Sequence, residues 1–227
     1  MPWHLRRWSL TEGWRSFLVD VAVVVIGVLL ALTAQQTADD WSWQGRIQEF
    51  RTTVDDEIGY DLYAYQNRLK QSTCVRQRLA ELEDWLAAWR GGHPYPLAAP
   101  IGYPAATAMQ TSTWDSRTDA LIGRLPLHIR VGYARLYAGI DNVRDLVRRE
   151  REPWAALQEY DGATKLDERD LMRLRGLINQ ARRLDTFLAL NYTALLARSR
   201  DLGIAPRVDP TVNAPPPWHC PPMKKAV

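Results

Sequence analysis

Histidine and cysteine, the usual ligands of structural and catalytic metals, are scarce in this chain. The four histidines are His4, His93, His128 and His219. None lies four residues from another or three residues after a glutamate, the spacings that helical metal sites require. His219 is adjacent to Cys220, but no second cluster complements this pair. The sequence therefore predicts no metal site and no cofactor.

Three consecutive acids, Asp55, Asp56 and Glu57, would point to different sides of a helix and would not converge as acid–base chemistry requires. We interpret them as a solvated helix face. The chain has no G-x-S-x-G motif, no Walker loop and no G-x-G-x-x-G after a strand, and Cys74 has no histidine nearby in sequence. These observations predict a protein that is not an enzyme. A catalytic site assembled from distant residues is the remaining alternative.

The composition is that of one ordinary domain. The chain has 227 residues, of which 46% are hydrophobic, with 29 Lys and Arg against 26 Asp and Glu. It therefore differs from disordered, collagen-like and disulfide-framework proteins. A formal net charge of +3 produces no strong field, so nucleic acid is not an expected partner.

One apolar segment is long enough to cross a membrane. Residues 17–34 contain a single charge, Asp20, and at about 1.5 Å per residue they span roughly 27 Å of helix. Tryptophans flank the segment on both sides, as is typical of membrane interfaces. We predict a transmembrane anchor over residues 17–38, with these interfacial side chains: Trp3, Trp8, Trp14, Trp41 and Trp43.

The basic residues predict the orientation of this anchor. Arg6, Arg7 and Arg15 precede it, whereas residues 35–50 contain only Arg46. By the positive-inside rule, residues 1–16 face the cytoplasm. A cleaved signal peptide is the alternative, but Leu32 stands where a small residue belongs, which favours a retained anchor. We expect the chain in the inner (cytoplasmic) membrane of a bacterial cell, with most of its residues in the periplasm.

Three residues of the anchor could contact another membrane helix. Asp20 is costly inside an apolar segment unless it reaches the interface or a partner, and both alternatives stay open. Gly27 and Ala31 form a small-xxx-small pair that permits close helix approach. We therefore predict contact with other membrane protein subunits and with membrane lipid.

The anchor carries a resemblance to a known group of proteins. Its residues Phe17-Leu18-Val19-Asp20 and Val25 to Leu32, followed by Trp41, resemble uncharacterised bacterial single-pass membrane proteins. The resemblance covers about thirty of the 227 residues. Those proteins usually have Asn-Trp or Glu-Trp directly after the anchor, whereas here Asp40-Trp41 follows a polar stretch. The resemblance implies a short N-terminal anchor and a helical extracytoplasmic body, and it implies no activity.

Apolar residues at three- and four-residue steps predict a helical body over residues 39–203. A first long helix is expected from about Trp41 to Arg90, with Gly59 its weakest point. A short helix from Trp114 to Ile122 is expected to be capped by Ser112 or Thr113.

Two further helices complete the predicted body. One starts near Pro126 and ends at Pro153. The other follows a capping box of Thr164 and Asp167 and runs to about Leu202. No strand-like alternation of useful length occurs. The predicted fold is all-α: one transmembrane helix followed by an antiparallel bundle of three or four helices.

Two proline-rich segments interrupt or follow these helices. Residues 91–106 form a loop that is either a partner-binding surface or a plain crossover, and residues 204–227 form a tail that is either disordered or seated in a groove. Aromatic side chains in and near these segments are the candidate partner contacts: Trp89, Tyr95, Tyr103, Trp114 and Trp218. Cys74 and Cys220 could form a disulfide that joins the tail to the first helix, but Cys74 could also be a small buried residue.

These features favour one function over another. The leading hypothesis is an accessory, structural or scaffold subunit of a larger membrane protein complex, acting through protein contacts. The alternative is a periplasmic ligand-sensing or binding module that signals through a partner, since helical bundles also bind small molecules between helices. The sequence identifies no small-molecule substrate.

Overall fold

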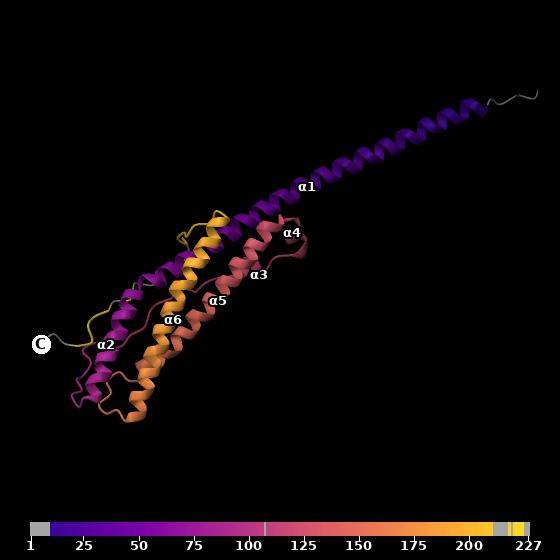
Figure 1. Cartoon of the computed structure of the whole chain (residues 1–227). Coiled ribbons are helices and arrows are strands. Elements are labelled where there is room, and N and C mark those ends of the chain that lie inside the picture. The colour runs from indigo at the N-terminus through magenta and orange to yellow at the C-terminus, as the bar shows by residue number, and fades with distance from the viewer. Residues whose placement is uncertain (1–9, 107, 211–217, 219, 225–227) are drawn as a thin grey trace, which may run out of the picture. The chain divides into compact units, whose positions relative to one another are not determined.

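The computed structural model describes residues 10–106, 108–210, 218 and 220–224, apart from the side chains of residues 10–13, 15 and 16. Within these ranges every regular element is a helix and none is a strand, as predicted (Figure 1). The chain divides into two compact units, Met1–Phe50 and Arg51–Val227. The first helix, α1 (Leu10–Lys70), contributes residues to both units.

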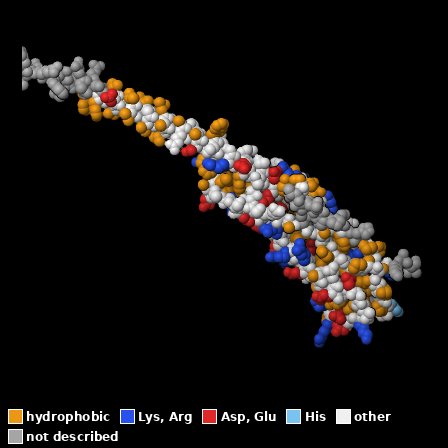
Figure 2. All heavy atoms as spheres, turned by 180° about the vertical axis from the view of Figure 1, so that it is seen from behind, with side chains coloured by type: hydrophobic (Ala, Val, Ile, Leu, Met, Phe, Trp, Pro, Cys, Tyr) orange, Lys and Arg blue, Asp and Glu red, His pale blue; other side chains and the backbone are white. Residues whose placement is uncertain are grey.

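The first unit contains the apolar segment. Every described residue from 17 to 42 is exposed, and Figure 2 shows hydrophobic side chains along this part of α1. By length and composition, the structure contains one helix that could cross a membrane. Signal sequences and the buried core helices of soluble proteins can have the same length and composition. In this helix, however, no residue of the apolar segment is buried.

In the second unit, α1 ends at Lys70 and α2 (Ser72–Arg90) begins after a single turn residue. The predicted weak point at Gly59 is wrong, because the helix is continuous there and interrupted at Gln71. The Gln71 side chain pairs with the backbone of Ala105, donating to its carbonyl at 2.8 Å and accepting from its N–H at 3.0 Å. Gly59 instead allows close approach of the tail to α1. Its carbonyl accepts the Arg207 N–H, and a Cβ at this position would lie 2.7 Å from Arg207 Cγ.

The expected helix over 114–122 is wrong in its bounds. The structure has two short helices in its place, α3 (Ser112–Asp115) and α4 (Asp119–Arg124). Neither Ser112 nor Thr113 is an N-cap, because Thr111 occupies that position for α3. Thr118 caps α4 by accepting the Leu121 N–H.

The fifth helix, α5 (Leu127–Gln158), begins after Pro126 and continues through Pro153, where the sequence predicted its end. Proline removes one helical hydrogen bond, but the following turn carries Trp154 and Leu157, whose relative exposures are 1% and 0%. Burial of these two large side chains favours continuation of the helix beyond the proline.

The sixth helix, α6 (Glu168–Asp201), ends close to the predicted residue but starts from a different cap. Asp167 accepts the Asp170 N–H and the Asp170 side chain accepts the Asp167 N–H, which makes a capping box one helical turn later than the predicted one. α6 packs against both α5 and α2, and α5 and α6 lie side by side in Figure 1. These packed helices, together with the second half of α1, surround the buried core of the second unit.

Candidate functional site

The predicted partner-contact residues are mostly occupied inside the second unit. Trp114 is only 7% exposed, and its ring stacks on that of Tyr137 at 5.0 Å. Trp114 therefore contributes to internal packing, and the expectation that it presents a contact surface is wrong. Tyr103 is different, because 57% of it is exposed.

Trp89, Tyr95 and Trp218 are half-buried and pack against the core cluster of the second unit. Trp218 meets Trp154 edge-on at 5.4 Å. The carbonyl of Tyr95 accepts a hydrogen bond from the indole N–H of Trp85 at 3.0 Å. These contacts leave each ring only partly available to another protein.

The described part of the tail lies on the helical body and adds to its core. Met223 is 1% exposed, and its carbonyl accepts the Ala98 N–H at 2.8 Å. The structure pairs Cys74 of α2 with Cys220 in a disulfide. A hydrogen bond therefore joins the tail to the loop of residues 91–106, and the disulfide joins the tail to α2.

The predicted membrane residues belong to the first unit. Trp14 and Trp41 are exposed, and Trp43 is half-buried beneath the Arg46 guanidinium group, 3.9 Å from its ring centre. Trp3 and Trp8 lie outside the described residues. All three predicted helix-contact residues are exposed: Asp20, Gly27 and Ala31.

A pocket of about 360 Å³ lies wholly in the second unit, and the sequence did not predict it. One wall is the α1 face from Thr53 to Asn67, another is the segment from Ala108 to Thr113, and the third is the tail segment 208–210. Four carboxylates line it: Asp56, Glu57, Asp61 and Asp209. Among the described residues that line it, none is Lys, Arg or His.

Glu57 is 7% exposed and receives hydrogen bonds on both carboxylate oxygens. Oε1 accepts from the Tyr137 hydroxyl at 2.7 Å. Oε2 accepts from the Thr113 N–H at 2.9 Å and from the Ser112 hydroxyl at 3.1 Å. The interpretation of Glu57 as part of a solvated face is wrong, because the side chain anchors α3 and α5 to α1.

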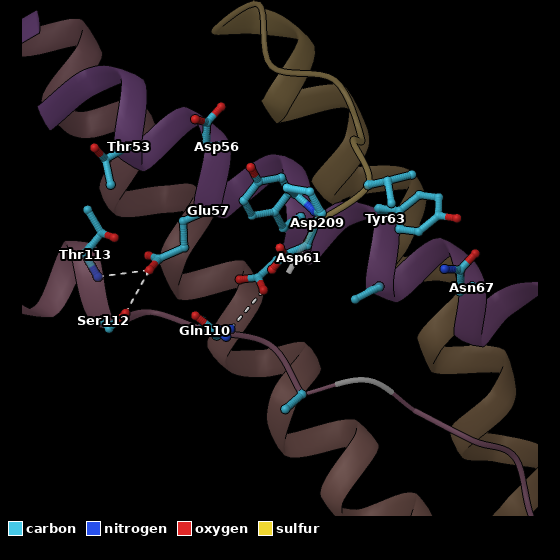
Figure 3. A pocket seen from close by; sticks show the side chains of 15 residues that line it. Thr53, Asp56, Glu57, Asp61, Tyr63, Asn67, Gln110, Ser112, Thr113 and Asp209 are labelled. Carbon is cyan, nitrogen blue, oxygen red and sulfur yellow. Dashed lines mark hydrogen bonds between the residues drawn. The ribbon is translucent and has the colours of Figure 1, made fainter. Parts of the chain in front are cut away.

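Asp61 is one turn further along the same face and is 4% exposed. Its Oδ1 accepts the Gln110 N–H at 2.9 Å, whereas Oδ2 is buried and has no hydrogen-bond partner among the described residues. In Figure 3 the side chains of Glu57 and Asp61 both extend from α1 toward the segment that carries Gln110, Ser112 and Thr113.

Burial is the main cause that raises the pKa of Asp61 to about 8, and the nearby charge of Glu57 adds to it. The Gln110 N–H and the charge of Arg144 act in the opposite direction. The raised pKa therefore favours the protonated, neutral form of Asp61 at pH 7. The sequence alone gave no reason to single out Asp61, because it occupies a polar position between the apolar residues of a predicted helix.

The other two acids of the predicted solvated face are half-buried. Asp55 accepts a hydrogen bond from the Tyr133 hydroxyl at 2.7 Å, and burial raises its pKa. Asp56 forms an ion pair with Arg207 of the tail. The three consecutive acids thus attach α1 to α5, to α3 and to the tail.

This arrangement supports binding better than catalysis. Asp61 can exchange a proton at neutral pH, but both oxygens of the neighbouring Glu57 are already acceptors of hydrogen bonds. In the part of the chain that the structure describes, no group of three or more His, Cys, Asp and Glu side chains is placed to hold a metal ion. The pocket size falls in the range of about 300–1,000 Å³ that is typical of small-molecule sites.

Comparison with known proteins adds no family or neighbour to these observations. No protein-family model matches the chain, and no similar curated protein or solved structure was found.

Proposed function

We propose that this chain is a non-enzymatic, single-pass membrane protein that acts as an accessory, structural or scaffold subunit of a larger membrane protein complex. Its first 16 residues lie in the cytoplasm of a bacterial cell, and a helical bundle lies in the periplasm. The observation that carries the proposal is the exposed row of Asp20, Gly27 and Ala31 on an apolar helix.

Exposure of the apolar segment supports a lipid environment. Twelve large hydrophobic residues between Phe17 and Leu32 are exposed, and a soluble monomer rarely exposes so much contiguous apolar surface. The segment matches the thickness of a bilayer core. The excess of arginine before it supports an N-terminus in the cytoplasm.

The three predicted helix-contact residues of the anchor lie on one side of the helix. At about 100° per residue, Asp20, Gly27 and Ala31 fall within about 20° of a common line. A Cβ added at Gly27 meets nothing within 4 Å, so this position is open in the isolated chain. A carboxylate and two small residues on one line fit a close contact with a second transmembrane helix.

The second unit offers little exposed aromatic surface for a partner contact. Its aromatic side chains mostly pack internally, which leaves Tyr103 as the most exposed of the five predicted contact residues. We therefore place the main partner contact in the membrane segment.

The test is extraction of the N-terminally tagged chain from native membranes in a mild detergent, followed by sizing and identification of stoichiometric companions. The proposal expects a large particle with defined partners. Ala31→Leu should dissociate it, because the added side chain blocks close helix approach. Ala22→Leu is the matched control, since residue 22 lies on the opposite side of the helix at about 200° from Asp20.

Two results would overturn the proposal. One is a lone monomer or dimer from native membranes. The other is a complex that survives Ala31→Leu, Gly27→Leu and Asp20→Asn equally well.

A second candidate function is an extracytoplasmic ligand-binding module that signals through a partner. The pocket lined by Glu57 and Asp61 favours it. Both functions can belong to one chain, because the pocket and the anchor lie in different units.

A further inference from the structure

We infer that the pocket between α1, the 108–113 segment and the tail segment 208–210 binds a small aliphatic amine in its ammonium form. This inference rests on the ligand-binding candidate function and names its ligand class. It does not depend on a membrane complex. The argument uses the charge of the lining, the unpartnered carboxyl oxygen and the size of the pocket.

The lining residues are acidic or uncharged, and two cations, Arg207 and Arg144, act on them from outside the lining. Four acidic residues line the space, and the described lining residues include no basic side chain. One of them, Asp56, is paired with Arg207. Asp209 also makes an interaction of its own. Glu57 is the fixed negative charge, held in place by the Tyr137 hydroxyl.

Asp61 supplies an unsatisfied hydrogen-bonding group at this place. Its Oδ2 is buried without a partner among the described residues, in a side chain that is 96% buried and lines the pocket. A buried polar atom without a partner is costly, and native proteins usually satisfy it with protein, water or ligand. A ligand N–H would give Oδ2 its missing partner.

An ammonium group fits better than the other ligand classes. An anion would be repelled by Glu57, and a neutral ligand would leave Glu57 with neutral hydrogen-bond donors alone. The described residues offer no three-ligand cluster for a metal ion. The Tyr60 ring also lines the pocket, and aromatic faces attract organic cations.

Binding of an ammonium ion should release a proton. The charged groups around Asp61 are Glu57, which raises its pKa, and Arg144 of α5, which lowers it. A ligand cation beside Oδ2 favours the carboxylate, so the O–H proton leaves to solvent as the ammonium binds. The other acidic residues that line this space are Asp209 and Asp56, and Asp56 is paired with Arg207.

The experiment is isothermal titration of the full chain in detergent micelles with 1,4-diaminobutane at pH 7. We expect saturable binding whose heat depends on the ionisation heat of the buffer, because a proton is released. Asp61→Asn should weaken binding by at least about tenfold, since a charge-assisted hydrogen bond becomes a neutral one. Asp84→Asn, which removes an exposed carboxylate outside the pocket, should bind as the unmodified chain does.

A second variant guards against a failure of Asp61→Asn to fold. Ala108→Trp places a large side chain at an exposed position of the lining and should also weaken binding without changing the core. The inference is overturned by the absence of saturable heat, by unchanged binding in both pocket variants, or by equal binding of the neutral 1,4-butanediol or of Mg²⁺. A thermal-shift screen of neutral and anionic compounds then separates a wrong ligand class from the absence of any ligand.

Discussion

Arg68 on α1 donates hydrogen bonds to both carboxylate oxygens of Glu150 on α5, and the two residues are only 1% and 2% exposed. Asp185 on α6 joins them at 3.2 Å from the Arg68 guanidinium, and Ser72 on α2 donates to Asp185 at 2.7 Å. One buried polar cluster thus connects four helices. Burial lowers the pKa of Arg68, but Glu150 and Asp185 outweigh it and raise the pKa, so the guanidinium remains charged.

We expect Glu150→Gln to lower the free energy of unfolding by about 3 kcal/mol or more, because it leaves a buried charge without its main partner. Asp145→Asn is the control, since it breaks only the exposed pairs with Arg148 and Arg149 and should cost less than about 1 kcal/mol. Urea unfolding in detergent, followed by circular dichroism, measures both. Equal losses in the two variants would contradict a structural role of the buried cluster.

The raised pKa of Asp61 predicts a pH dependence of stability. In the unfolded chain this carboxyl has its ordinary value of 3.8, and in the folded chain it titrates at about 8. Between these values the folded state holds a proton that the unfolded state has lost. The free energy of unfolding therefore falls as pH rises, from a full contribution below 3.8 to none above about 8.

Asp61→Asn removes this dependence because the amide stays neutral. We expect the variant to unfold at a higher urea concentration than the unmodified chain at pH 8.5, with a difference that shrinks toward pH 5. A dependence of the same sign, over a narrower pH window, should remain from Asp55, whose pKa is also raised by burial. A constant difference at every pH would show that Asp61 does not bind the extra proton.

Gly102 is required both by its backbone and by its neighbour. Its φ is +67°, and a Cβ there would lie 2.8 Å from Trp218 Nε1. We expect Gly102→Ala to destabilise the protein by about 1–3 kcal/mol. Gly92→Ala is the matched control: its φ is +77°, but no atom lies within 4 Å, so it should cost about 1 kcal/mol. Chemical unfolding of both variants gives the difference, and equal costs would mean that Trp218 does not pack here.

The disulfide predicts a dependence of stability on redox state. Cys74 and Cys220 are 146 residues apart, so their bond closes a long loop of the unfolded chain. We expect the Cys74→Ser, Cys220→Ser double variant to lose about 2–5 kcal/mol of stability. The mass of the intact chain with and without reductant checks the bond directly. Faster proteolysis of the tail in the double variant is the second expected result, and unchanged cleavage would argue against the tail contacts.

Most contacts of the candidate site could not be predicted from the sequence alone. Asp55, Asp56 and Glu57 follow one another, and local reasoning could only place them on different sides of a helix. It could not show that Tyr133, Tyr137 and Arg207 lie opposite them, because those partners are 78 to 151 residues away. Asp61 carried no local feature at all.

The sequence by itself determined what short-range physics controls. Apolar residues at helical spacing predicted the helical class, and a continuous apolar segment predicted a helix long enough to cross a membrane, since both depend on neighbours within a few turns. Only the tertiary structure decided that α5 continues through Pro153, that Trp114 and Trp218 pack internally, and that Glu57 and Asp61 line a pocket. Burial decides these features, and burial depends on contacts between residues far apart in the chain.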